Sequence, residues 1–281
     1  MIISSFYKYV KIKNPEIFRR KHLDYCNKLK IKSNIIVAKE GINGLVSGTK
    51  EQIKIYEKYL VKNKLFKNII FKHNTINSHP LKKTIVKVKE EIVTSKLKVN
   101  IKNKGKHVSP KDLNKLIEKE KIILLDTRNN YESKIGKFKN AIIPNINNFK
   151  EFKKLKKNLQ KYKSEKIVMY CTGGVRCEKA SAFLKESGFK NVFQLEGGII
   201  NYINKYPDKH FEGRCFVFDN RMSIPSGQKS EEINLCELCH ASSNNYINCA
   251  NLKCDKLFIT CSDCSKKMKN TCSKKCLKLL K

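Results

Sequence analysis

The first third of the chain alternates short apolar runs with segments of helical periodicity. Apolar residues recur every three or four positions in 15–30, and again in 49–63, where Thr49 and Gln52 have the spacing of a capping box. Alternating runs that are typical of strands cover 4–12, 33–48 (two strands), 66–74 and 82–94. This βαββαβ order predicts a small α+β domain over residues 1–95, with two helices on one face of a sheet.

The pattern changes after residue 95. Segment 96–110 is basic, lacks periodicity and ends at Pro110, which predicts a linker. Helical segments (109–120, 149–162 and 177–188) then alternate with apolar strands (121–128, 166–170 and 191–195). Strands separated by helices indicate a parallel α/β sheet covered on both faces, over 111–212. The remaining 213–281 is rich in cysteine and loops, and too poor in apolar periodicity to form a core alone.

The net charge of +35 favours a nucleic-acid partner but does not establish one. Of the 60 basic residues only six are Arg, which leaves 54 Lys, and Asn and Ile are also abundant. An A/T-rich genome produces the same bias, whereas phosphate-binding sites usually prefer the planar guanidinium of Arg. No apolar stretch approaches the roughly 20 residues that span a bilayer, and the N-terminus lacks the zones of a signal peptide. We therefore expect a cytoplasmic protein.

Cys171 lies at the point where an apolar strand turns into a helix. Gly173 and Gly174 follow it, and glycines there allow the backbone amides to surround an anion. With the helix N-terminus behind it, this loop is expected to lower the pKa of the Cys171 thiol and to hold a thiolate open to reagents. Arg176 is expected to add a fixed cation at the rim. Cys177 has two interpretations, a packed core residue or a thiol that resolves an oxidised Cys171.

Eight of the twelve cysteines lie between residues 236 and 276, in four closely spaced pairs. The pairs are Cys236 and Cys239, Cys249 and Cys254, Cys261 and Cys264, and Cys272 and Cys276. Such pairs fit two all-cysteine zinc sites, or one site with spare thiols. His240 could replace one thiolate, and an iron–sulfur cluster is an alternative to zinc. A metal would supply stability that this small segment lacks.

The loop CTGGVR, residues 171–176, resembles the active-site loop of rhodanese-type sulfurtransferase domains. It consists of Cys171, Thr172, Gly173, Gly174, Val175 and Arg176. Further matches to the rhodanese pattern are Asp126, Arg128, Tyr131, Glu132, Gly136, Phe138, Ala141, Pro144 and the segment LEGGI at 195–199. Asp126, Arg128 and Glu132 are expected to support the loop, Arg128 and Glu132 through an ion pair or hydrogen bonds.

Taken with EGINGLVSG, KVKEEIVT, CEKAS and GRCFVFDNRMSI, the chain resembles over its whole length one bacterial family, the rhodanese-domain tRNA uridine hydroxylases. The resemblance implies a ferredoxin-like, acylphosphatase-like N-terminal domain, a rhodanese domain and a Cys-rich tail. It also implies 5-hydroxylation of the wobble uridine of tRNA with molecular oxygen, and an essential, persulfide-forming Cys171. The electron donor is not implied.

Two other functions compete with this interpretation. A sulfurtransferase that moves sulfane sulfur through a Cys171 persulfide uses the same loop, although simple transfer needs neither flanking domain. A zinc-stabilised RNA-binding module with an inactive loop is the non-enzymatic alternative.

The N-terminal domain offers two further features. Tyr7 and Tyr9, with Phe6 and Phe71 and the lysines around them, are expected either to form a basic, aromatic surface for RNA or to pack in the core. The segment EGING, 40–44, predicts a turn whose backbone approaches a partner closely.

Overall fold

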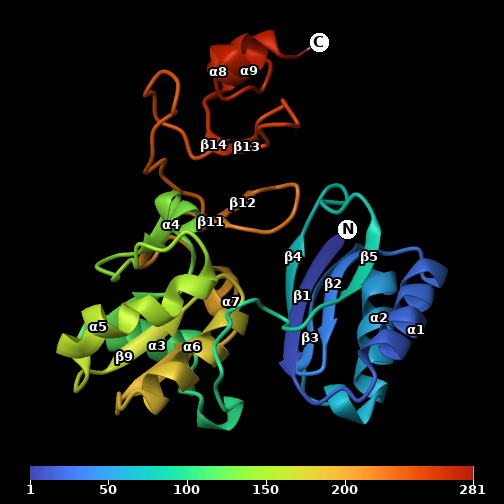
Figure 1. Ribbon diagram of the computed structural model, residues 1–281, viewed down its shortest axis with the longest axis vertical. Helices are drawn as coiled ribbons and strands as arrows, with labels where there is room; N and C mark the ends of the chain where they lie inside the picture. The colour runs from blue at the N-terminus through green and yellow to red at the C-terminus, as the bar shows by residue number, and fades with distance from the viewer. Residues whose placement is uncertain (281) are drawn as a thin grey trace.

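The computed structural model describes residues 1–280 and divides the chain into three parts (Figure 1). An N-terminal α+β domain packs beside a central α/β domain, and the Cys-rich tail projects from the central domain at one end of the molecule. No helix of the described residues is long and apolar enough to cross a membrane.

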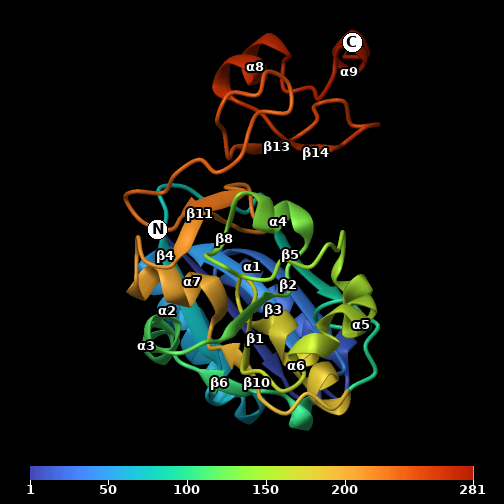
Figure 2. The same ribbon diagram turned by 90° about the vertical axis from the view of Figure 1, so that its left-hand side faces the viewer.

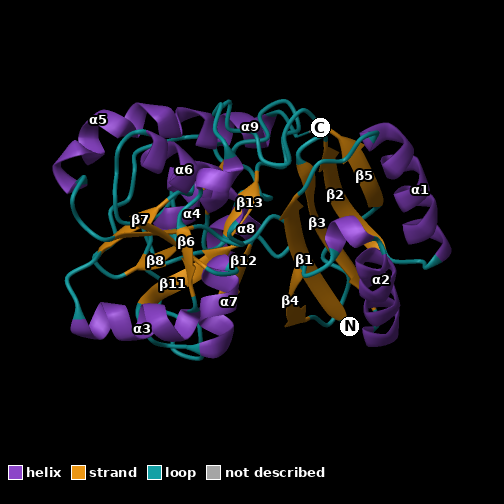
Figure 3. Ribbon diagram, turned by 90° about the horizontal axis from the view of Figure 1, so that it is seen from below, coloured by secondary structure: helices purple, strands orange, loops and turns teal. Residues whose placement is uncertain are grey.

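The N-terminal domain is a five-stranded sheet with both helices on one face (Figure 3). Its strand order is β4-β1-β3-β2-β5, and all neighbours are antiparallel except β2 and β5. The elements are β1 (Ile2–Tyr9), α1 (Pro15–Lys28), β2 (Lys32–Ala38), β3 (Gly41–Gly48), α2 (Lys50–Lys62), the 3₁₀ turn η1 (Lys64–Phe66), β4 (Ile70–Thr75) and β5 (Thr84–Val88). The helices leave the other face of the sheet uncovered, and that face turns toward the central domain.

Both N-terminal helices begin at a capped residue, and for α2 it is the one predicted from the sequence. Asn14 accepts a hydrogen bond from the Ile17 amide at the start of α1, and Thr49 and Gln52 form a complete capping box on α2. Both helices bury one side against the sheet in a core that includes Tyr56 and Leu60 of α2.

The central domain is a four-stranded parallel sheet of order β6-β10-β9-β7 (Figure 2). Its elements are η2 (Ile101–Asn103), β6 (Lys106–Val108), α3 (Pro110–Lys119), β7 (Ile123–Asp126), α4 (Asn130–Lys134), β8 (Gly136–Phe138), η3 (Phe149–Leu155), α5 (Lys156–Leu159), η4 (Gln160–Tyr162), β9 (Ile167–Tyr170), α6 (Val175–Glu186), β10 (Val192–Leu195) and α7 (Gly198–Lys205). The helix expected over 149–162 is a succession of 3₁₀ and α turns.

Alternate residues of β9 point into two separate cores, because successive strand residues face opposite sides of a sheet. Val168 packs with α3 and α7, whereas Ile167 and Met169 pack with α6 and the segment that contains α5. The parallel sheet is therefore covered on both faces, as the alternation of strands and helices predicts.

The segment expected to be a linker also contributes to the central sheet. Its last part contains β6, which pairs in parallel with β10 at the edge of that sheet. Because β6 has only three residues, the alternation of apolar and polar residues is too short to predict this strand. The domain boundaries expected from the sequence stay predictions.

The tail has little regular structure. β11 (Phe211–Phe216) pairs with β8 and with β12 (Ser223–Pro225). A two-stranded ribbon of β13 (Tyr246–Asn248) and β14 (Leu257–Ile259) precedes the short helices α8 (Ser262–Lys267) and α9 (Lys274–Lys278). The buried apolar residues of the tail either join the core of the central domain, as Cys215 and Ile224 do, or form small clusters such as the one around Phe258.

Candidate active site

The loop that follows β9 wraps around the side chain of Cys171. The amide of Gly174 donates a hydrogen bond to Cys171 Sγ over 3.1 Å. Gly174 has φ 98°, a left-handed conformation that favours glycine, and it brings the amides of the next helix, α6, toward the sulfur. The start of α7 holds the other side of the loop, because the Ile199 amide donates to the Cys171 carbonyl over 2.9 Å.

The environment of Cys171 favours its thiolate. Burial disfavours ionisation of this thiol, but the hydrogen bond from the Cys177 thiol and the nearby Arg176 charge outweigh it. With the amides of Gly174 and Arg176 added, the pKa of Cys171 falls to about 5. For Cys177 the same proximity acts in the opposite sense, and burial together with Cys171 raises its pKa well above the usual value. Of the two thiols, Cys171 is the one that ionises.

Cys177 is fully buried in the first turn of α6. Its Sγ lies 3.6 Å from Thr127 Oγ1, and its side chain packs in the core on the α6 side of the sheet. These contacts agree with the packing interpretation, and the resolving role stays a prediction.

Arg176 does not stand at an open rim. Its guanidinium is buried and forms a bidentate ion pair with Glu132, with Nη1 to Oε1 at 2.5 Å and Nη2 to Oε2 at 2.7 Å. Glu132 also accepts from Thr172 Oγ1 over 3.2 Å. The pair therefore ties the loop to α4, and the charge of Arg176 is largely compensated by Glu132.

Arg128 and Glu132 do not form an ion pair with each other. Arg128 pairs instead with Asp126, whose carboxylate accepts from Arg128 Nε and Nη2, from the Arg128 amide and from Ser133 Oγ. All of these groups are buried. Arg128 Nη2 also donates to the Gly136 carbonyl over 2.7 Å, so this second pair fixes the start of β8.

Cys171 is fully buried, which contradicts the expectation of a sulfur open to reagents. The cause is the N-terminal domain, which covers the loop. A Cβ on Gly174 would lie 3.0 Å from the Tyr7 hydroxyl, and Lys72 Nζ donates to the Gly173 carbonyl over 3.0 Å. Sequence reasoning missed Lys72, because nothing in the sequence distinguishes it from the other lysines.

The aromatic residues of β1 divide between the two faces of the N-terminal sheet. Phe6 lies in the core with Phe71 against it, so neither is part of an RNA-binding surface. Tyr7 and Tyr9 face the central domain, where their hydroxyls donate to Glu178 over 2.9 Å and to the Val175 carbonyl over 3.2 Å. Of the two alternatives, core packing is confirmed for Phe6 and Phe71, whereas Tyr7 and Tyr9 pack against the central domain and Tyr7 lines the cavity beside Cys171.

The EGING segment contacts the central domain of the same chain. Glu40 Oε2 lies 2.9 Å from Lys179 Nζ, and Glu91 Oε2 lies 2.7 Å from the same atom. Glu40 lies in the turn between β2 and β3, and residues 41–44 belong to β3, so the segment is the end of a turn followed by the beginning of a strand. Lys179 is buried and is held by two carboxylates of the N-terminal domain, which joins the two domains directly beside the loop.

A cavity of about 460 Å³ lies between the uncovered face of the N-terminal sheet and the Cys171 loop. The N-terminal sheet contributes Asn34, Asn43 and Lys72 to its wall, and the central domain and the start of the tail contribute Cys171, Phe149 and Phe218. Amide and ammonium groups beside apolar surfaces suit a flat, polar ring such as a nucleobase.

The eight tail cysteines form two groups of four. Cys236 and Cys239 join Cys261 and Cys264, whereas Cys249 and Cys254 join Cys272 and Cys276. The first pair thus combines with the third, and the second with the fourth. Of the two arrangements expected from the spacings, the structure has the one with two sites. His240 belongs to neither group.

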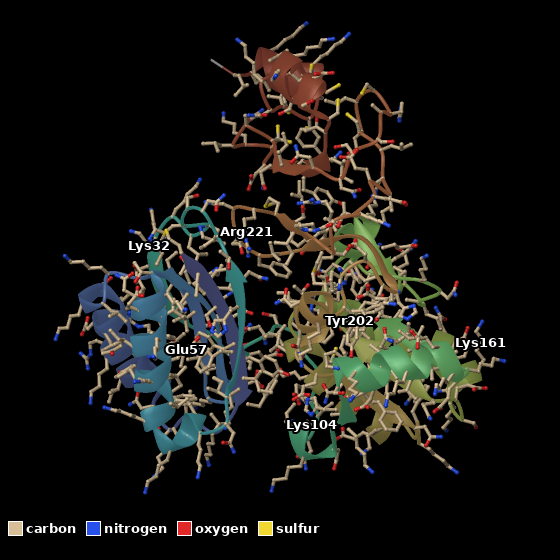
Figure 4. The ribbon with its side chains drawn as sticks, turned by 180° about the vertical axis from the view of Figure 1, so that it is seen from behind. Lys32, Glu57, Lys104, Lys161, Tyr202 and Arg221 are labelled. Atoms are coloured by element: carbon tan, nitrogen blue, oxygen red, sulfur yellow. The ribbon has the colours of Figure 1, made fainter. Side chains whose placement is uncertain are left out.

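The sulfur positions fit a single tetrahedral ion in each group. Sγ atoms of Cys239 and Cys261 are 3.6 Å apart, and those of Cys254 and Cys272 are 3.7 Å apart. Zn–S bonds of about 2.3 Å place the sulfurs of a tetrahedral site roughly 3.8 Å apart. A four-iron cluster would separate them further, because each sulfur binds a different iron. Figure 4 shows sulfur atoms in the projecting tail, at the end of the molecule opposite to Lys104.

Three family models match the chain in succession. Residues 1–92 match the UPF0176 acylphosphatase like domain, residues 109–205 the rhodanese-like domain, and residues 212–277 the rhodanase C-terminal region. They confirm the expected fold class: an acylphosphatase-like domain, a rhodanese-like domain with a parallel sheet, and a Cys-rich C-terminal region.

Relatives are similar over nearly the whole chain. A protein of Cytophaga hutchinsonii is 39% identical over 274 residues, 96% of this chain and 88% of its own length. A protein of onion yellows phytoplasma is 39% identical, with 98% of this chain and 92% of its own length covered. One from Bacillus cytotoxicus is 39% identical, with 96% and 86% covered. Each is named tRNA uridine(34) hydroxylase.

Proposed function

The chain belongs to the tRNA uridine(34) hydroxylase family, and from this premise we propose that it hydroxylates C5 of the wobble uridine of tRNA with molecular oxygen. The observation that carries the proposal is the position of Cys171, a sulfur favoured as an anion at a cavity walled by two domains. The anticodon loop offers unstacked bases, which a protein can take into such a cavity.

Cys171 is the catalytic residue in this proposal. Gly174 and the rest of the loop hold its sulfur as thiolate or persulfide, while Glu132 fixes the loop through Arg176. Asp126 and Arg128 keep the neighbouring backbone in place, and Cys177 donates to the Cys171 anion. Oxygen is the co-substrate, and an electron donor outside the chain completes the reaction.

The two cysteine groups of the tail hold structural zinc in this proposal. Four thiolates close each tetrahedral site and leave no position for a substrate. We place the enzyme in the cytoplasm, where its tRNA substrate is.

A sulfurtransferase is the second candidate, and the loop itself favours it. The same amides would stabilise a Cys171 persulfide. The N-terminal domain argues against simple transfer, because Tyr7 and Lys72 cover the loop and leave Cys171 without exposed surface. Transfer to a small thiol needs no such cover, whereas a reaction on a bound base benefits from excluding water.

Nucleoside mass spectrometry tests the function. A bacterial strain without its own enzymes for this modification is complemented with the full chain and grown under ¹⁸O₂. We expect 5-hydroxyuridine-derived nucleosides to return with one ¹⁸O atom at C5. Their absence, or an oxygen that comes from water, would refute the proposal. Sulfane sulfur transfer in vitro without any change in tRNA would establish the second candidate instead.

A further inference from the structure

Lys72 is a lysine of the N-terminal domain that is buried against the active-site loop. It lies on β4 opposite Ser5 of β1, on the sheet face that turns toward the central domain, and is only 6% exposed. Its Nζ donates to the Gly173 carbonyl over 3.0 Å and lies 5.0 Å from the centre of the Tyr7 ring. It also lines the cavity that Cys171 lines.

The charge of Lys72 has no carboxylate partner among the ion pairs of residues 1–280. The other buried lysine, Lys179, has two, Glu40 and Glu91. Tyr7, over whose ring the Lys72 ammonium lies, donates to Glu178, and Glu178 already binds Lys104 at 2.7 Å and His107 at 3.1 Å. A buried ammonium without a counter-charge is costly, so its retention calls for a reason.

The anion that remains for Lys72 is the sulfur of Cys171. The charge of Arg176 also acts on this sulfur, but Arg176 is itself paired with Glu132. Burial lowers the pKa of Lys72 to about 8, and the attraction of Cys171 acts against that fall. At neutral pH most of the ammonium therefore stays charged.

We propose that Lys72 is a positioning residue for the reaction at Cys171: from the N-terminal domain it fixes the loop through the Gly173 carbonyl and balances the charge of the Cys171 sulfur. The active centre is then complete only when the two domains are packed together. The catalytic part of this inference rests on the proposed function, whereas the effect on the Cys171 sulfur does not.

The first experiment titrates the sulfur in the full chain. Thiolate absorbance near 240 nm is followed against pH, and the matching Cys171→Ser protein is subtracted so that the zinc thiolates cancel. Lys72→Met is expected to raise the midpoint of Cys171 by about one pH unit, since a nearby opposite charge favours the ionised form. Lys166→Met is the control: it removes an exposed lysine of the central domain whose charge is paired with Glu120, and it should leave the midpoint unchanged.

The second experiment measures hydroxylation by the same proteins. Lys72→Met is expected to lower kcat about 10²-fold, the effect of losing one well-placed electrostatic group. The KM for tRNA should change less than about threefold, because a buried lysine cannot meet phosphates. Lys72→Arg keeps the positive charge, so it should retain most activity. Wild-type activity should fall above a pH of about 8, where Lys72 loses its proton, and this fall should be absent in Lys72→Arg.

Other groups around Lys72 also titrate, so the change of activity with pH must be assigned either to Lys72 or to one of them. They come from β1, from β6 with the segment before it, from η3, from the loop after β9 and the start of α6, and from the segments before α7 and after β11. The titratable and charged groups that line the two cavities beside Lys72 are Tyr7, Lys8, Tyr9, Lys104, His107, Lys150, Cys171, Arg176, Glu178, Glu196, Asp219 and Arg221. A high-pH limb that persists in Lys72→Arg would belong to one of these groups and would overturn the role of Lys72. A second result would also overturn the role of Lys72. It is a Lys72→Met protein that is folded, as an unchanged melting temperature shows, and that keeps both the wild-type kcat and the wild-type Cys171 midpoint. A wild-type protein without hydroxylase activity would instead refute the proposed function, and the titration would still decide the role of Lys72.

Discussion

Glu132→Gln removes one charge of the buried ion pair that ties the active-site loop to α4. In the native protein the Glu132 carboxylate meets both Nη atoms of Arg176 and accepts from Thr172 and from the Asn129 amide. Gln keeps the shape of the side chain but leaves the Arg176 charge uncompensated with almost no exposed surface.

Breaking a buried ion pair on one side costs about 3–5 kcal/mol. With roughly 4–8 °C per kcal/mol for a domain of about 100 residues, calorimetry should show the central domain melting roughly 12–40 °C lower. Arg176→Met combined with Glu132→Gln should cost less than the sum of the single changes, because no unpaired charge remains.

The matched control is Glu120→Gln, which removes the carboxylate of the exposed Lys166–Glu120 pair. Exposed pairs contribute about 0–1 kcal/mol, so this variant should melt within a few degrees of the wild type. A Glu132→Gln protein that melts with the control would refute the view that the Arg176 pair holds the loop.

Three further predictions concern the sulfur, the metal and the domain contact. Because the pKa of Cys171 is about 5, kcat/KM for hydroxylation should be level just above that pH and fall about tenfold per unit below it; activity that already declines as the pH is lowered from about 8 would contradict a preformed thiolate. Metal analysis should find two zinc ions per chain and about one in Cys261→Ser or Cys272→Ser, since each change opens a different group; loss of both ions from either variant would contradict two separate sites. Tyr7→Phe should destabilise the protein by about 1.5–3 kcal/mol and Tyr9→Phe by about 1 kcal/mol, since only Tyr7 donates to a carboxylate; equal losses in chemical denaturation would contradict this.

The order of helices and strands was predictable because it depends on local patterns. The cap at Thr49 and the apolar strand before Cys171 each lie within one short stretch of sequence. The metal groups were predictable only in part. The spacing within each cysteine pair is local, but the combination of Cys236 with Cys261 depends on how the β13–β14 ribbon folds back.

The interdomain half of the site was not predictable from the sequence. Alternation along β1 shows that Tyr7 and Phe6 face opposite sides, but not that a second domain covers the side of Tyr7. Lys72 is hidden among 54 lysines, most of which are solvated. The burial of Arg176 could not be foreseen either, because its partner Glu132 lies 44 positions away in the chain.

A comparison of two buried cysteines in cells tests the central claim most directly. Burial raises the pKa of Cys215 to about 12, so this thiol is as enclosed as Cys171 but stays neutral. In the complemented strain, Cys171→Ser should abolish the 5-hydroxyuridine-derived nucleosides at position 34, whereas Cys215→Ser should preserve them. Modified uridine at wild-type levels in the Cys171→Ser strain would show that this sulfur is not the reactive centre.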